Sequence, residues 1–231
     1  MRYFKVLNID GRSTGSQEFQ WLLPPGEGPG QWLPTVEGDI VVYVNGYHIC
    51  TVSQLIPWLG PCIWEVEVRG DVVDADKMTV VRSARIIAPT RWDESSARLF
   101  ACDCAARALR RERRAGREPD KRSWKAIKVA RRYAKGKATK AELTAARTAA
   151  GYVWDVAWAN ISATDWTTDN IDFWTATRTA WDITYDDASV AVRDATDAAT
   201  GYNRDAAAGD VERRWQARRL QEYLLGKPGE E

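Results

Sequence analysis

The pattern of hydrophobic and polar positions changes near residue 90 of this 231-residue chain. Before that point, short apolar runs alternate with Gly, Pro, Asn and Asp, as in a β-rich module. After it, apolar residues recur at helical spacing in long stretches that contain little proline. We therefore expect an α+β chain: a small β-rich module at residues 1–90, an Ala- and Trp-rich bundle of about six short helices at 91–226, and a polar tail at 227–231.

Short strands joined by turns are expected in the N-terminal module. A β-branched run at residues 40–44 precedes Asn45-Gly46, a strong hairpin signal, so residues 47–50 are expected to return as its partner strand. Residues 53–59 are expected to form one short helix before Gly60-Pro61. Further strands are expected at residues 3–7, 63–68, 78–81 and 84–87.

The Ala-, Asp- and Thr-rich tract at residues 141–209 carries five tryptophans: Trp154, Trp158, Trp166, Trp174 and Trp181. Alanine favours helix, but in one continuous helix these indoles would drift around the whole surface. Several short helices avoid this, with breaks near residues 164–169 and 184–187 and a helix at 186–200 that ends at Gly201. The indoles are interpreted as core packing, and exposed anchors for a partner are the alternative.

Basic helices precede this tract. Helices are expected at residues 93–115 and 120–136, a capping box at 139–142 begins a third, and residues 211–225 form a last one. The helix at 120–136 is the most clearly amphipathic. Its apolar side carries Trp124, Ile127, Ala130 and Ala134. Its opposite side carries five cations: Lys121, Lys125, Lys128, Arg132 and Lys135.

Charge is unevenly distributed, although the net charge is only +1. Residues 107–147 hold 16 Lys+Arg and 4 Asp+Glu, which gives +12, whereas residues 151–210 hold 3 Arg and 11 Asp, which gives −8. Three interpretations stay open: solvated faces, internal pairing of the two tracts, and a charged partner. Nucleic acid would bind the five cations named above. A protein partner would bind the acidic residues Asp169, Asp172, Asp186, Asp187, Asp194 and Asp197.

No residue pattern indicates a catalytic, cofactor-binding or metal site. His48 shares a strand face with Cys50, but a metal ion would need further ligands and only Cys62 is near, so a structural role is favoured. The four cysteines suit a reducing cytosol. The N-terminus lacks the apolar segment of a signal peptide, and no apolar run predicts a membrane span, so a cytoplasmic protein is expected.

Two parts of the chain resemble known families. Residues 98–107 (RLFACDCAAR), 119–122 (PDKR), 125–127 (KAI) and 132–136 (RYAKG), followed by the Ala-rich tract, resemble a helical immunity-protein family linked to bacterial polymorphic toxins. That resemblance covers about residues 92–202, although the family tract is richer in Ala and His where this chain has Asp, Thr and Trp. Residues 3–7 (YFKVL), 46–50 (GYHIC), 58–61 (WLGP) and 65–70 (EVEVRG) resemble a domain common in phage and prophage proteins. The resemblances imply a two-part phage or prophage protein, and neither brings an assigned catalytic residue.

The first functional hypothesis is a non-enzymatic, immunity- or inhibitor-like protein that presents an acidic helical surface to a protein partner. The second is nucleic-acid binding through the helix at 121–135. The order of GYHIC, short helix and IWEVEV also resembles the core of small ADP-ribosyltransferase-like folds, which would require a cleft lined by His48 and by Tyr43 or Tyr47. Self-assembly through exposed tryptophan faces is the fourth hypothesis.

Overall fold

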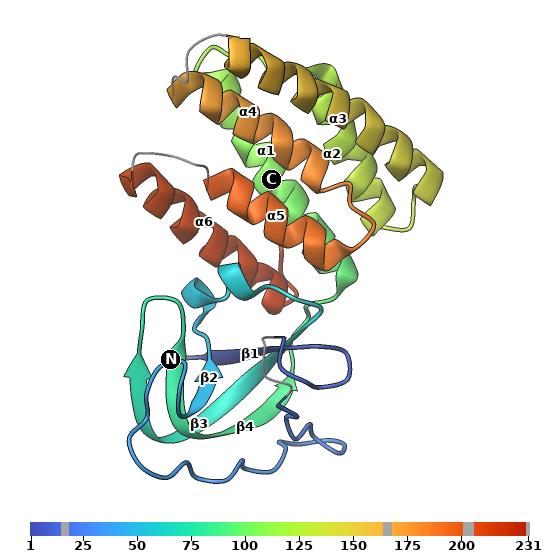
Figure 1. Cartoon of the computed structure of the whole chain (residues 1–231). Helices are drawn as coiled ribbons and strands as arrows, with labels where there is room; N and C mark the ends of the chain where they lie inside the picture. The colour runs from blue at the N-terminus through green and yellow to red at the C-terminus, as the bar shows by residue number, and fades with distance from the viewer. Residues whose placement is uncertain (15–18, 164–167, 201–205, 230–231) are drawn as a thin grey trace. The chain divides into compact units, whose positions relative to one another are not determined.

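The computed structural model describes residues 1–14, 19–163, 168–200 and 206–229 (Figure 1). Contacts divide the chain into two compact units. One consists of Met1–Asp93 together with Ala217–Gly229, and the other of Glu94–Gln216. An antiparallel sheet is followed by helices, so the expected α+β class is confirmed.

The first unit is built on four antiparallel strands in the order β1-β3-β4-β2. They are β1 (Tyr3–Leu7), β2 (Tyr47–Ile49), β3 (Cys62–Asp74) and β4 (Thr79–Pro89), with two short 3-10 helices, η1 (Val52–Gln54) and η2 (Ile56–Trp58), between β2 and β3. Phe4 and Cys50 exchange two backbone hydrogen bonds, Phe4 N to Cys50 O at 2.7 Å and Cys50 N to Phe4 O at 2.8 Å. The two edge strands are therefore linked to each other at one end, and the sheet curls around its apolar side.

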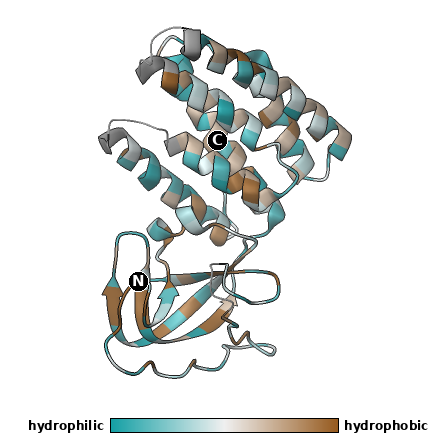
Figure 2. Cartoon of the chain, viewed as in Figure 1, coloured by the Kyte–Doolittle hydropathy of each residue, from teal (hydrophilic) through white to brown (hydrophobic). Residues whose placement is uncertain are grey.

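Alternating side chains of this curled sheet form its core. The strands carry the strongly hydrophobic segments that Figure 2 colours brown, as a half-buried sheet requires. Leu7, Ile49, Val66, Val81, Ala84 and Ile86 pack together with Trp21 and Leu33 from the long loop after β1. That loop hydrogen-bonds along β4 through the N–H groups of Gly30, Leu33 and Val36. Pro34, which lies between Leu33 and Val36, lacks an N–H group, so the loop does not become a regular strand.

The prediction of a hairpin at residues 40–50 is wrong. Residues 40–44 form no strand, because Val41 and Asn45 close a tight turn inside that run. The Asn45 side chain donates to the carbonyls of Glu37 (3.0 Å) and Asp39 (2.8 Å), which fixes the turn. The strand that follows, β2, pairs with β4 instead, with His48 opposite Val80. The strands expected separately at 78–81 and 84–87 are one continuous strand, and the helix expected at 53–59 is two 3-10 turns.

Six helices follow the sheet in the part of the chain that the structure describes. They are α1 (Glu94–Arg114), α2 (Lys121–Ala134), α3 (Lys140–Ala163), α4 (Thr168–Asp182), α5 (Ala188–Thr200) and α6 (Ala206–Leu224). Three helix ends show the capping residues predicted from the sequence. Asp120 caps α2 by accepting from Arg122 N at 2.7 Å, Thr139 and Glu142 form the capping box of α3, and Gly116 has the positive φ of 82° that favours glycine after a helix.

Stacked indoles join α3 to α4, but Trp154, Trp174 and Trp181 are only half-buried, so they lie at the edge of the core. Trp154 lies on Trp181 with ring centroids 5.4 Å apart and planes 4° from parallel. Trp174 is 6.2 Å from Trp154 and 5.4 Å from Trp158. Gly151 permits this approach, because a Cβ there would lie 3.1 Å from Trp181 Nε1. Trp158 is the most exposed of the four, and Trp166 lies outside the described residues.

The expected break near residues 184–187 is observed between α4 and α5. The break near 164–169 falls largely on residues outside the described ranges, as does the expected end at Gly201. Among the described residues, no helix combines the length and the apolar character that crossing a bilayer requires.

Candidate functional site

The five cations predicted for nucleic-acid binding are all exposed: four lie on α2, and Lys135 directly follows its last residue. Arg132 is engaged locally, with its guanidinium 3.2 Å from a Glu142 carboxylate oxygen and 2.7 Å from the Lys137 carbonyl. Within the described residues, the other four form no ion pair: Lys121, Lys125, Lys128 and Lys135. Internal pairing with the acidic tract therefore does not account for this stripe.

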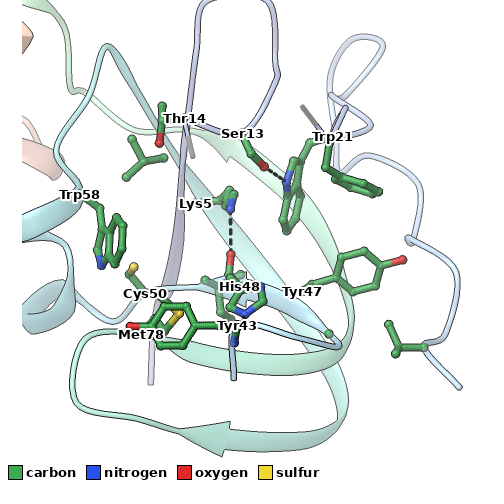
Figure 3. A pocket seen from close by; sticks show the side chains of 15 residues that line it. Lys5, Ser13, Thr14, Trp21, Tyr43, Tyr47, His48, Cys50, Trp58 and Met78 are labelled. Carbon is green, nitrogen blue, oxygen red and sulfur yellow. Dashed lines mark hydrogen bonds between the residues drawn. The ribbon is translucent and has the colours of Figure 1, made fainter. Parts of the chain in front are cut away.

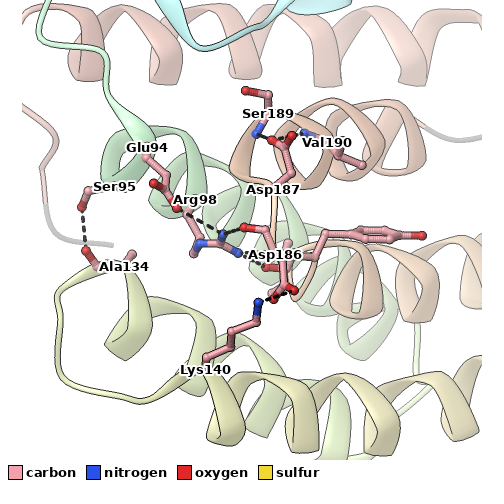
Figure 4. Close-up of polar contacts among 11 residues, drawn as sticks. Glu94, Ser95, Arg98, Ala134, Lys140, Asp186, Asp187, Ser189 and Val190 are labelled. Carbon is pink, nitrogen blue, oxygen red and sulfur yellow. Dashed lines mark hydrogen bonds and ion pairs between the residues drawn. The ribbon is translucent and has the colours of Figure 1, made fainter.

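The acidic residues predicted for protein binding are distributed differently. Asp186 pairs with Lys140 at 3.0 Å, and Asp187 caps α5 by accepting from Ser189 N at 2.7 Å (Figure 4). Asp172 and Asp194 are half-buried, Asp197 is exposed, and the Asp169 side chain lies outside the described ones. Desolvation, followed by the charge of Asp194, raises the pKa of Asp197 above its usual value. Two of the six carboxylates thus serve the α4–α5 connection of their own unit.

A buried arginine organises the same connection. Arg98 of α1 is only 1% exposed, and its guanidinium donates to the carbonyls of Ile183 (3.3 Å), Tyr185 (2.6 Å) and Asp186 (2.8 Å), as Figure 4 shows in part. It also lies 5.0 Å from the centre of the Tyr133 ring. These carbonyls follow the end of α4, where backbone acceptors are left unsatisfied and a cation is favoured. Arg98 is therefore a structural cation.

One cavity of about 550 Å³ opens in the first unit and is lined by residues from β1, β2 and the loops around them (Figure 3). Its walls are aromatic: Phe19, Trp21, Tyr43, Tyr47 and Trp58, together with His48. Phe19, Trp21 and Tyr47 are mutual neighbours, with ring centroids 5.7–6.1 Å apart. The Trp21 indole also donates a hydrogen bond from its Nε1 to Ser13 Oγ at 3.2 Å.

Lys5 projects into this cavity from β1. Its Nζ donates to the His48 carbonyl at 2.9 Å and lies 5.1 Å from the centre of the Trp21 ring (Figure 3). Among the described residues, no carboxylate pairs with it, and the cavity lining contains no acidic side chain. Desolvation by burial lowers the pKa of Lys5 from 10.5 to about 8. The cavity thus contains a partly dehydrated cation that has no anionic partner in the described part of the chain.

His48 and Tyr43 shape the cavity mouth. Tyr43 has a φ of 65°, a conformation that residues with a Cβ rarely adopt. Its N–H donates to His48 Nε2 at 2.8 Å, and the two rings stack with centroids 6.2 Å apart. His48 Nε2 is an acceptor here, which requires the neutral ring, and desolvation lowers the pKa of His48 below 6.5. His48 therefore fixes the backbone at Tyr43 through this hydrogen bond and also lines the cavity.

The other groups of the cavity show no sign of an activated nucleophile or a metal site among the described residues. Burial raises the pKa of the Cys50 thiol to about 12, so it is protonated near neutral pH. Over the described residues, no group of three or more His, Cys, Asp and Glu is arranged to hold a metal ion. A cleft lined by His48, Tyr43 and Tyr47, as the ADP-ribosyltransferase-like hypothesis requires, is present, and among the described residues its lining includes no carboxylate.

Sequence analysis did not identify Lys5, Trp21 or Trp58 as site residues. Lys5 lies inside a strand-like run, where alternation predicts a solvent-facing cation. Among the described residues, Ser13, Thr14, Phe19 and Trp21, together with lining residues between Tyr43 and Trp58, enclose it. Searches of the sequence against protein-family models and curated proteins, and of the fold against solved structures, find no significant match. The function is therefore inferred from the geometry of the cavity.

Proposed function

We propose that the N-terminal unit binds a small organic anion with a flat, apolar body, and that Lys5 receives the anionic group. The observation that supports this most directly is a lysine that lines an aromatic cavity and has no carboxylate partner among the described residues. Partly buried charges in proteins are normally paired, since leaving water costs free energy that an opposite charge recovers. A negatively charged ligand supplies the missing partner.

The cavity walls favour a flat ligand. Aromatic rings make offset and edge contacts with other rings, and the cavity presents five aromatic side chains and an imidazole. A volume of about 550 Å³ falls in the usual range for small-molecule sites, which are mostly apolar and contain few polar groups. Here the polar groups near the cation are neutral: the Ser13 hydroxyl, the His48 imidazole and the Cys50 thiol. A ligand with one negative charge would therefore meet no competing carboxylate from the described residues of the lining.

The test compares one acid with its uncharged amide. We expect 2-naphthoate to bind the full-length chain more tightly than 2-naphthamide in calorimetric titrations at pH 7. A hydrogen bond to a charged group contributes about 1.5–3 kcal/mol, so the ratio of dissociation constants should be roughly 10- to 150-fold. In Lys5→Met, which keeps the length of the side chain without its charge, the acid should bind no better than the amide.

The matched control is Lys77→Met, because Lys77 is exposed on the same unit and does not line the cavity. This variant should keep the preference for the acid. Equal binding of acid and amide by the native chain, or an unchanged preference in Lys5→Met, would contradict the proposal. So would the absence of saturable binding of either compound.

A further inference from the structure

We infer that the exposed side of α2, together with Tyr152 of α3, binds single-stranded nucleic acid. This site belongs to the helical unit and is independent of the cavity around Lys5. It rests on three observations: the alignment of cations along α2, the freedom of the four lysines among them from acidic partners within the described residues, and an exposed aromatic ring beside them.

The cations form a straight stripe. Lys121, Lys125, Lys128, Arg132 and Lys135 follow one another at spacings of four, three, four and three residues. At 3.6 residues per turn these positions fall within an arc of about 80°, and at 1.5 Å per residue they extend over about 21 Å. The other side of α2 is buried through Ser123, Ala126, Ile127, Val129 and Ala130. The stripe therefore faces away from the core of its own unit.

Little opposes this positive charge locally. The segment from Lys121 to Ala134 contains no acidic residue. Glu142 is engaged by Arg132, and Asp120 accepts a forked pair of hydrogen bonds from the Arg122 guanidinium at 3.0 and 2.7 Å. Four lysines thus remain available to phosphates, and release of the counterions around those phosphates drives binding.

Tyr152 adds a stacking surface that the sequence of α2 does not reveal. Its side chain comes from α3, is 59% exposed, and lies under Arg122 with the guanidinium carbon 4.9 Å from the ring centre. Arg122 is one residue after Lys121 and three before Lys125, so the ring lies beside the first half of the stripe. The combination of an open aromatic ring, an arginine and a row of lysines matches proteins that bind unpaired bases.

The stacking surface favours single strands over duplexes. Base faces are free to stack on a side chain only where the bases are unpaired, whereas a duplex offers phosphates and groove edges. A helix whose flanking ring stays half in solvent can accept one unpaired base at Tyr152 while the backbone follows the lysines. Both RNA and DNA strands present this chemistry, so both belong in the test.

The test measures fluorescence anisotropy of labelled 15-nucleotide DNA and RNA single strands with the full-length chain, over a series of salt concentrations. With four free lysines contacting phosphates, the slope of log K against log salt should be about −2.8, and Lys125→Ala/Lys128→Ala should reduce it by about 1.4. Tyr152→Ala should weaken binding about fivefold or more without changing the slope, because stacking carries no counterion term.

The control pair Lys77→Ala/Lys227→Ala removes the same charge from exposed positions outside α2 and should leave both affinity and slope unchanged. No binding of either strand at low salt, or equal losses in the two lysine pairs, overturns the inference. It is also overturned if Tyr152→Ala binds as the native chain does while duplexes or polyglutamate bind equally well, because the stripe would then attract any polyanion.

Discussion

Each unit of this protein contains a buried or half-buried cation, and the two differ in how many acceptors surround them. In the helical unit, Arg98 donates to three backbone carbonyls and lies over the Tyr133 ring. In the N-terminal unit, Lys5 donates to one backbone carbonyl, that of His48, and its Nζ lies over the Trp21 ring. Glu94 adds a carboxylate oxygen 3.7 Å from Arg98, whereas no carboxylate approaches Lys5 in the described chain.

The difference separates a structural charge from one that is available to a ligand. The three carbonyls that accept from Arg98 belong to the α4–α5 connection, so the arginine contributes to the stability of the fold. Lys5 bears a desolvation cost that its surroundings do not offset, which is why its pKa falls to about 8. Sites that bind ligands commonly sacrifice stability in this way. Substitutions at the two cations should therefore have opposite effects on stability.

The largest expected effect is at Arg98. Arg98→Leu removes the side chain that donates to three carbonyls after the end of α4. Removing one partner of a buried charged interaction usually costs about 3–5 kcal/mol. We expect a loss of this size in the free energy of unfolding, measured by urea titration followed through tryptophan fluorescence.

Arg114→Leu is the matched control, because Arg114 lies on the same helix but is exposed. It should change stability by less than about 0.5 kcal/mol. If both arginine variants lose the same small amount, Arg98 is not the structural cation that its contacts indicate, and the contrast with Lys5 disappears.

A gain in stability is expected at Lys5. Below pH 8 the folded and unfolded chains both carry the proton, so the folded chain bears the full cost of a dehydrated ammonium. Between about 8 and 10.5 the folded chain loses the proton first, and its stability rises with pH until the cost vanishes above 10.5. Lys5→Met should therefore raise the free energy of unfolding at pH 7 by roughly 1–3 kcal/mol.

The pH dependence distinguishes this cause from better packing of the methionine. When urea titrations are repeated at increasing pH, the gain should stay nearly constant up to about pH 8 and then shrink toward pH 10, whereas a packing gain would stay constant throughout. Lys77→Met should show no gain at any pH, since Lys77 is already exposed. A destabilised Lys5→Met at pH 7 would show that the lysine is structural and would remove the main support for the ligand.

Sequence reasoning succeeded where local signals and burial agree. The helix at 120–136 was predicted with its cap at Asp120 and its five cations on one side, and α2 shows both features. Here the 3.6-residue period, the capping aspartate and the glycine at 136 all indicate the same element. The exposed stripe could therefore be predicted residue by residue, although the adjacent ring of Tyr152 could not, because it comes from another helix.

Prediction from sequence failed where a segment pairs with a distant part of the chain and not with its neighbour in sequence. Asn45-Gly46 favours a two-residue hairpin, but the Asn45 side chain is used by the carbonyls of Glu37 and Asp39, and β4 takes β2 as its partner. The same rearrangement places Tyr43 and His48 at the cavity mouth. Nothing within four or five residues of Lys5 or Arg98 distinguishes them from solvated cations, so their roles depend on contacts made more than 40 residues away.

The smallest expected change in stability is at Tyr43, and it asks whether strain at the cavity mouth is also linked to binding. Tyr43 is 63% exposed and keeps a φ of 65°, which for a residue with a Cβ costs about 1–2 kcal/mol. Asparagine tolerates this conformation better, but Tyr43→Asn also loses the stack on His48, which is worth about 0.5–1.5 kcal/mol. We expect the two terms to offset to within about 1 kcal/mol, while the affinity for 2-naphthoate falls because one aromatic wall is gone.

Tyr43→Phe keeps the ring and the backbone strain, so it should bind the probe as the native chain does. If Tyr43→Asn binds equally well, the turn at 41–45 owes its strained geometry to the loop hydrogen bonds of Asn45 alone, and the aromatic wall of the cavity must be assigned to Trp21, Tyr47 and Phe19.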